Sequence, residues 1–311
     1  SQMRQEGNDP IILDAGDLFF TTPDLHDSNR VSEKYRTAVI LTGYEKIGCN
    51  AINVGQYEFG GGEKFLLIMA GSTQIPFISA NLIDTQTNQL LFNPYIIIER
   101  EGLKIGVIGL TNLLPETIKN IRADDYITVG KSMIKKVKDQ VDIIVMLVNA
   151  NRADQKTLTK EFKEANLIFT SGSTTLTRPM MNQPEKGPYL FSTGRESRYL
   201  NVTDISLKNK TDPIINISFL EASQQYNQRK LDRLQDTFPD QTLEEAYKGQ
   251  ENILSLIAKS RATIIQTDMQ IKEAVNTLFY KNVALDSKII DDQEVLEFVN
   301  NSLAICNQLK N

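Results

Sequence analysis

The sequence predicts an α/β fold over residues 1–220, followed by a helical extension over 221–311. Three observations predict it. Short buried apolar runs alternate with amphipathic stretches up to about residue 220. From Glu221 onward Gln, Glu, Lys, Asn and Leu dominate, a composition typical of surface helices. The length of 311 residues is about twice the ~150-residue norm for one domain, which fits a large domain with an appendage.

Short apolar runs that end in polar or glycine residues are the expected strands. They lie at residues 11–13, 51–54, 77–80, 95–98, 105–108, 143–148, 167–169, 189–191, 200–205 and 214–217. Helical stretches are expected between several of them, at 32–47, 62–71, 132–138 and 153–165. The last strands, from Tyr189 onward, follow one another through short polar turns, so we expect them to pair antiparallel.

The extension is expected to be a helical hairpin followed by a bracing helix. A helix over 223–237 should pair with a second helix that begins at the capping box of Thr242 and Glu245 and continues to about residue 278. A cap at Asp291 predicts the start of the final helix.

Charge and composition exclude several classes of function. Lys and Arg total 34 against 39 Asp and Glu, and the net charge of −5 has the wrong sign for a nucleic-acid binder. No apolar run approaches the ~18 residues that span a bilayer. The single histidine, His26, cannot build a His-rich metal centre, and Cys49 and Cys306 could form at most one long-range bridge. Because the chain begins at Ser1 without a signal segment, we expect a processed front end.

Two expected strands end in polar residues and glycines. Asp14-Ala15-Gly16-Asp17 follows the first strand, and a glycine-rich segment over 55–62 follows the second. Ligands collect at the carboxyl ends of strands in layered α/β folds. A carboxylate beside a glycine turn suits a hard cation, and a two-metal centre needs such a carboxylate as its bridge. Taken alone, such segments more often form Asx caps and tight turns, and the glycines lack the Lys-Ser/Thr of a P-loop.

Six sequence blocks in order carry a family resemblance. They are ILDAGD at 12–17, NVGQYEF at 53–59, PFISANL at 76–82, KIGVIGLT at 104–111, LVNAN at 147–151 and LIFTSGSTT at 167–175. Together they resemble the motifs of calcineurin-like metallophosphoesterases, in their 5'-nucleotidase branch. The resemblance implies a four-layer sandwich in which two mixed sheets are flanked by helices.

The resemblance also implies a metal site, and this chain departs from it at most positions. The family hydrolyses phosphoesters with an upstream Asp-x-His, a bridging Asp, an Asn ligand, three later His ligands and a catalytic His. Asp17 stands at the bridging position, and the Asp-x-His would precede Ser1. The replaced positions are Gln56 for the Asn ligand, Tyr57 for the catalytic His, and Asn149, Gly172 and Thr174 for the three later His ligands.

These replacements predict a dismantled dimetal site. A neutral carboxamide is a poor ligand beside imidazole, and glycine offers no side-chain donor. A phenol is a much weaker acid than an imidazolium, so Tyr57 suits structure or binding better than turnover. We therefore assign no catalytic residue and expect no cofactor. The residues that we expect to bind a small anion or a protein partner are Asp14, Gln56, Tyr57, Asn81, Asn149, Asn151 and Arg195. Arg195 could instead pair with a carboxylate such as Glu196.

Three functional hypotheses follow. The favoured one is a non-catalytic binding or scaffold module of an exported system, in the periplasm or at the cell surface. The second is a phosphomonoester or 5'-nucleotide hydrolase that holds Mn, Zn, Mg or Ca with ligands from upstream of Ser1. The third is a docking subunit for a haem or membrane-associated partner, because residues 279–282 resemble an extension that precedes multihaem c-type cytochrome regions. The chain itself has no Cys-x-x-Cys-His for covalent haem.

Overall fold

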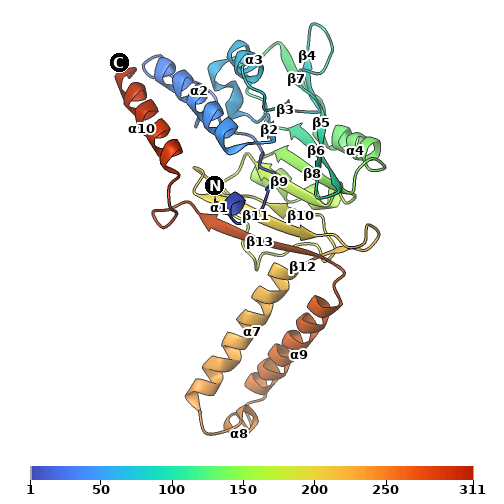
Figure 1. Cartoon of the computed structure of the whole chain (residues 1–311). Helices are drawn as coiled ribbons and strands as arrows, with labels where there is room; N and C mark the ends of the chain where they lie inside the picture. Colours follow the sequence, from blue (N-terminus) through green and yellow to red (C-terminus); the bar gives the residue numbers. More distant parts are fainter. Residues whose placement is uncertain (1, 311) are drawn as a thin grey trace. The chain divides into compact units, whose positions relative to one another are not determined.

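The computed structural model describes residues 2–310, which form two compact units (Figure 1). Within the described residues, the first unit comprises residues 2–176, 188–199 and 284–310, and the second comprises residues 177–187 and 200–283. Several sheets flanked by helices confirm the predicted mixed α/β class. None of the helices in residues 2–310 combines the length and the apolar composition that crossing a membrane requires.

Two main sheets organise the first unit. The smaller sheet is parallel, in the order β1-β2-β3, and the larger is mixed, in the order β10-β9-β8-β6-β5. Their strands are β1 (Leu13–Asp14), β2 (Ala51–Asn53), β3 (Phe77–Ile78), β5 (Tyr95–Arg100), β6 (Leu103–Thr111), β8 (Ile143–Asn149), β9 (Leu167–Ser171) and β10 (Tyr189–Phe191). Only β5 runs antiparallel to its neighbour in the larger sheet. The expected antiparallel run from Tyr189 is wrong: β10 pairs parallel with β9, the strand at 214–216 pairs parallel with the one at 276–278, and the strand at 199–206 belongs to another sheet than β10.

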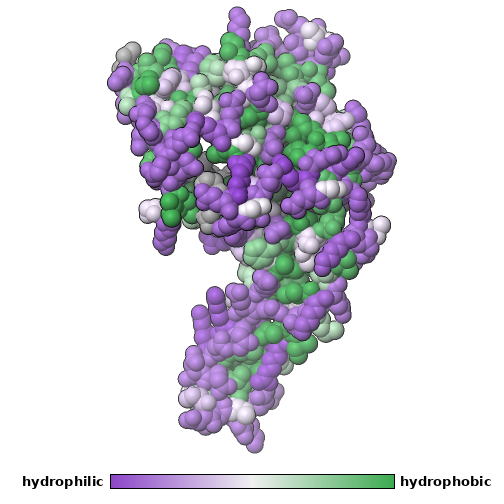
Figure 2. Space-filling model, viewed as in Figure 1, coloured by the Kyte–Doolittle hydropathy of each residue, from purple (hydrophilic) through white to green (hydrophobic). Residues whose placement is uncertain are grey.

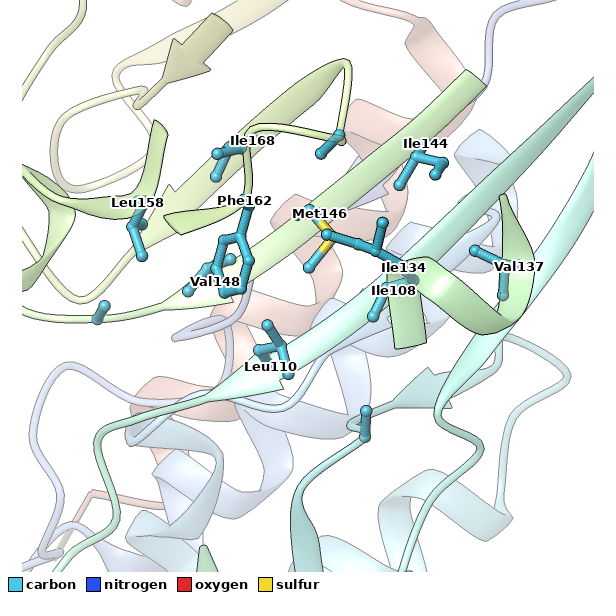
Figure 3. Packing of buried hydrophobic residues seen from close by; sticks show 13 residues of the cluster. Ile108, Leu110, Ile134, Val137, Ile144, Met146, Val148, Leu158, Phe162 and Ile168 are labelled. Atoms are coloured by element: carbon cyan, nitrogen blue, oxygen red, sulfur yellow. The ribbon is translucent and has the colours of Figure 1, made fainter. Parts of the chain in front are cut away.

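Strand β8 is buried along its whole length, as expected for a strand covered on both faces. Helix α4 (Tyr126–Val137) covers one face, and its start is capped by Asp125, which accepts a hydrogen bond from the backbone of Thr128. Ile134 of α4, Met146 of β8 and Phe162 belong to one apolar cluster (Figure 3). Phe162 directly follows two short helices, α5 (Arg152–Gln155) and α6 (Leu158–Glu161).

A second core in the same unit lies around the smaller sheet. It gathers Phe19, Phe59 and Leu66 with side chains from β2 and β3. The helical elements of this part of the unit are α1 (Gln2–Gln5), α2 (Arg30–Ile47), the 3-10 helix η1 (Tyr57–Gly61), α3 (Glu63–Gly71) and α10 (Gln293–Gln308).

Helix α10 lies beside α2 (Figure 1), although more than 240 residues separate the two segments. The Ser32 hydroxyl donates to the Cys306 carbonyl at 2.9 Å, and Lys46 pairs with Glu294 at 2.7 Å. Both Cys49 and Cys306 are buried free thiols. The cap of α10 is Asp292 rather than the predicted Asp291.

The second unit contains a three-stranded sheet and a helical hairpin. The sheet has the order β11-β13-β12, with β11 (Tyr199–Ser206), β12 (Ile214–Asn216) and β13 (Asn276–Ala284). The hairpin consists of α7 (Ile217–Thr237), the short α8 (Leu243–Ala246) and α9 (Glu251–Glu273). Leu231, Tyr247 and Ile257 form the centre of its apolar core, and Figure 2 shows hydrophilic residues over most of its visible outer surface.

The predicted extension over 221–311 is correct for the hairpin and wrong beyond it. The capping box of Thr242 and Glu245 is present, at the start of α8. The expected helix through residue 278 is wrong, because α9 ends at Glu273 and residues 276–284 form β13. Alternating burial along this β-branched and aromatic segment favours a strand. The final helix, α10, belongs to the first unit rather than to an appendage.

Candidate functional site

The candidate site lies at the carboxyl ends of β1, β2, β8 and β9. Asp17 follows β1, Glu58 lies in η1 after β2, Asn149 ends β8 and Ser171 ends β9. Because parallel strands place their carboxyl ends at a common edge of a sheet, these four residues lie close together.

Asp17 is the centre of the site and is held by N–H donors. Its Oδ1 accepts from the backbone N–H of Tyr57 at 3.0 Å, and its Oδ2 accepts from Nδ2 of Asn149 at 2.9 Å. The same Nδ2 donates to Oγ of Ser171 at 2.8 Å. Burial raises the pKa of Asp17, and the hydrogen bonds from Tyr57 and Asn149 oppose that rise. Asp17 has a φ of 68°, a left-handed conformation that aspartate tolerates better than most residues.

Glu58 is the candidate-site residue whose structural role the sequence did not reveal. Its fully buried carboxylate accepts four backbone N–H groups, from Asp17 at 2.9 Å, Leu18 at 2.5 Å, Phe19 at 3.2 Å and Gly55 at 2.6 Å. Burial raises the pKa of Glu58, the charge of Asp17 adds to that rise, and the N–H donors lower it. A glutamate in the otherwise apolar and glycine-rich segment 54–62 was the available clue.

Asp14 is a third carboxylate at the same edge and is partly buried. Its Oδ1 accepts from the backbone of Gly16 and its Oδ2 from the Tyr44 hydroxyl, both at 2.8 Å. Burial is the largest cause that raises the pKa of Asp14, while these two donors lower it. The pKa of Tyr44 is also raised, by burial first and then by the charge of Asp14.

We expect Tyr44→Phe to lower the free energy of unfolding by about 1.5 kcal/mol at pH 8 and by less at pH 4. The hydroxyl donates to the ionised Asp14 carboxylate, and the bond loses its charge assistance when Asp14 takes up a proton. Since the folded-state pKa of Asp14 is raised, that proton binds more readily in the folded protein, so the bond weakens as pH falls. Urea unfolding at both pH values would measure it, and an equal loss at both would contradict it.

The backbone packs closely around the carboxylates. A Cβ on Gly55 would lie 2.6 Å from Oδ1 of Asp17 and 2.9 Å from Nδ2 of Asn149. A Cβ on Gly172, whose φ is 82°, would lie 2.7 Å from the carbonyl oxygen of Ala150. The glycines therefore allow the strand-end loops to close onto one another where a larger residue would hold them apart.

These residues do not fit a dinuclear metal centre. Both oxygens of Asp17 accept N–H groups, and Asn149 presents its amide nitrogen rather than an oxygen. Gly172 has no side-chain donor, and Thr174 is exposed. Among the residues that the structure describes, no three His, Cys, Asp or Glu side chains are arranged as a metal-binding group. Each of the three carboxylates, Asp14, Asp17 and Glu58, instead faces hydrogen-bond donors.

The structure brings only part of the predicted binding set together. Asp14, Asp17 and Asn149 converge with the backbones of Gln56 and Tyr57. The Tyr57 side chain packs against the apolar core around Phe19 and Phe59.

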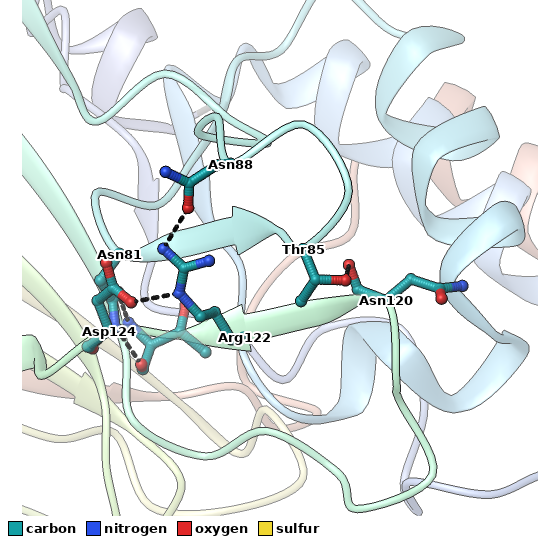
Figure 4. Close-up of polar contacts among 7 residues, drawn as sticks. Asn81, Thr85, Asn88, Asn120, Arg122 and Asp124 are labelled. Atoms are coloured by element: carbon teal, nitrogen blue, oxygen red, sulfur yellow. Dashed lines mark hydrogen bonds and ion pairs between the residues drawn. The ribbon is translucent and has the colours of Figure 1, made fainter.

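The other predicted residues have local structural roles. Asn81 is fully buried and donates to the carbonyls of Thr111 and Asp124. It lies where β4 (Leu82–Asp84) pairs with β7 (Ile121–Ala123), and Arg122 of β7 bonds to Asp124 and to Asn88 (Figure 4). Asn151 caps α5. Arg195 is exposed and pairs with Glu196, as the alternative interpretation expected.

Sequence and structure comparisons agree on the family. No family model matches the chain. A 5'-nucleotidase of Vibrio cholerae is 30% identical over 159 residues, which are 48% of this chain and 27% of that protein. A 5'-nucleotidase precursor from Thermus thermophilus has a TM-score of 0.56 at 19% identity, covering 68% of this chain and 45% of the other. These similarities support the predicted assignment to the calcineurin-like metallophosphoesterase superfamily.

The calcineurin-like phosphoesterase YfkN from Bacillus subtilis has the same fold. Its TM-score is 0.53 at 21% identity, with 75% of this chain and 88% of that chain covered. This confirms the predicted metallophosphoesterase-type fold and its 5'-nucleotidase branch. The chain spans about a quarter of the length of the curated relatives that it matches first.

Proposed function

We propose that this domain is a non-catalytic descendant of the metallophosphoesterases and serves as a binding or scaffold module. The observation that carries the proposal is the hydrogen bond from Nδ2 of Asn149 to Oδ2 of Asp17. The resemblance puts a His ligand at position 149 and the bridging Asp at 17. An amide N–H now meets the carboxylate where a metal cation would have to lie, and the two cannot share that oxygen's inward lone pair.

Two further observations support the proposal. The side chain at the family's catalytic His position, Tyr57, is partly buried and packs against the apolar core around Phe19 and Phe59. Position 172 is a glycine with positive φ and no room for a Cβ, so no ligand can project from it without movement of the backbone. The proposed loss of metal binding and catalysis therefore involves the side chain at position 57 and the backbone at position 172.

A hydrolase completed by ligands from outside this sequence is the competing proposal. It makes Asp14, Asp17, Gln56 and Asn149 ligands of a divalent metal, and it requires Asn149 to turn its amide oxygen toward that ion. Export and a docking role for residues 279–282 also remain proposals; these residues lie in β13, where Phe279 is exposed.

We expect the purified protein to hold less than one equivalent of Mn or Zn and to leave AMP and p-nitrophenyl phosphate unhydrolysed above the buffer rate. The measurements are elemental analysis after incubation with each metal and phosphate release with and without EDTA. An Asp17→Asn variant is the matched control, because any trace contaminating phosphatase persists in it. Two bound metal equivalents together with hydrolysis that Asp17→Asn abolishes would establish the competing hydrolase.

A further inference from the structure

Side-chain hydrogen bonds join the two sheets of the first unit at their carboxyl ends. From the larger sheet, Asn149 of β8 donates to Asp17, and the Ser171 hydroxyl of β9 donates to the carbonyl of Ala15 at 2.8 Å. Nearby, the Thr111 hydroxyl of β6 donates to the carbonyl of Val54 at 2.5 Å. Residues 15, 17 and 54 lie in the loops that follow β1 and β2 of the smaller sheet, so each bond crosses between the sheets.

The smaller sheet contributes one bond in the opposite direction. Asn53 of β2 is fully buried, and its Nδ2 donates to the carbonyl of Leu110 of β6 at 3.1 Å and to that of Ala15 at 3.0 Å. The connection between the sheets is therefore a network rather than one contact. Within this network, the bond between Asn149 and Asp17 is the member that involves a carboxylate.

The neighbours of Asn149 fix which end of its amide faces Asp17. The Ser171 hydroxyl proton is directed to the carbonyl of Ala15, which leaves Oγ of Ser171 as an acceptor toward Asn149. Asp17 Oδ2 is also an acceptor. A group between two acceptors must be a donor, so Nδ2 lies there and Oδ1 points away, where it has no hydrogen-bond partner. The space between Asp17 and Ser171 therefore requires a hydrogen-bond donor, and the NH₂ group of Asn149 supplies it.

We infer that Asn149 replaces the metal ions as the electropositive bridge between the two sheets, so that the closed arrangement of the strand ends is stable without a cation. The inference deepens the proposed function and rests on it. Asn149 is a positioning residue in this role: it holds the loop of Asp17 against β8 and β9. The bridge needs an amide at one of positions 17 and 149 and a carboxylate at the other, in either order.

A polarity-swap cycle in EDTA tests the bridge. Asn149→Asp places two carboxylates against each other, and Asp17→Asn removes the charge; each is expected to lower Tm by about 6–15 °C. The double variant Asp17→Asn with Asn149→Asp restores an amide opposite a carboxylate and is expected to regain at least half of the summed loss. Asn88→Asp, at an exposed turn where the side-chain oxygen accepts from Arg122, is the matched control and should stay within about 2 °C.

Additive losses in the double variant would overturn the inference, because they would show that the two side chains do not interact. If Asn149→Asp fails to fold, the same cycle with Asn149→Ala and Asp17→Ala measures the coupling, and zero coupling again overturns it. A rise in Tm of the unaltered protein by several degrees on adding Mn²⁺ would also overturn it. Hydrolysis of AMP by the unaltered protein would defeat the proposed function alone, since the cycle reads only stability.

Discussion

Glu58→Ala is expected to lower the free energy of unfolding by about 3–5 kcal/mol, the largest effect of any single substitution at this site. The carboxylate accepts four backbone N–H groups from the loops that follow β1 and β2. Each buried N–H left without an acceptor costs about 1–3 kcal/mol, and partial entry of water limits the total. Urea unfolding followed by circular dichroism would measure the loss.

Glu58→Gln separates acceptor geometry from side-chain size. Each carboxylate oxygen of Glu58 accepts two N–H groups, so glutamine keeps the shape and one acceptor oxygen, but its NH₂ group would face the two N–H donors of the other oxygen. We therefore expect a loss between that of Glu58→Ala and zero. Glu99→Ala is the control, since the Glu99 side chain is largely exposed, and it should change the free energy by less than about 0.5 kcal/mol. A loss for Glu58→Ala no larger than the control's would contradict this account of the loops.

The sequence was sufficient to predict the α/β class, the family and the convergence of Asp17 with Asn149. Strand-end position and ordered motifs specify these features, because parallel strands bring their carboxyl ends to one edge. The role of Glu58 was not predictable from spacing, since its partners are backbone N–H groups, which the sequence does not distinguish. Likewise Asn81 and Asn151 occupy motif positions and yet serve a strand junction and a helix cap.

The error in the extension has a different cause. Residues 254–278 carry apolar residues at spacings that a helix and a strand both accept over short windows. The distinction comes from pairing with β12, whose register joins Ile214 to Asn276 and Asn216 to Leu278. Such a pairing joins segments about 60 residues apart and is decided by tertiary contacts, which local periodicity does not contain.

Gly172→His, which would restore the residue type of the family at one ligand position, is expected to cost about 2–4 kcal/mol and to gain no metal affinity. A φ of 82° costs an L-residue about 1–2 kcal/mol, and the overlap of Cβ with the Ala150 carbonyl and the Leu113 side chain adds about 1–3 kcal/mol. To relieve that overlap the loop must move away from β8, which would carry the new imidazole away from Asp17.

Gly102→Ala isolates the conformational part of this cost. Gly102 has a comparable φ of 78°, and nothing lies within 4 Å of its Cβ position, so only the backbone strain of about 1–2 kcal/mol is expected. Gly172→Ala should cost more than Gly102→Ala by the overlap alone, and urea midpoints of the three variants give the comparison. If Gly172→His matched Gly102→Ala in stability and gained several degrees of Tm with Mn²⁺, the strand-end loops would be open enough to rebuild a ligand. Closure of the backbone would then no longer support the proposed loss of the metal site, and the proposal would rest on the side-chain replacements alone.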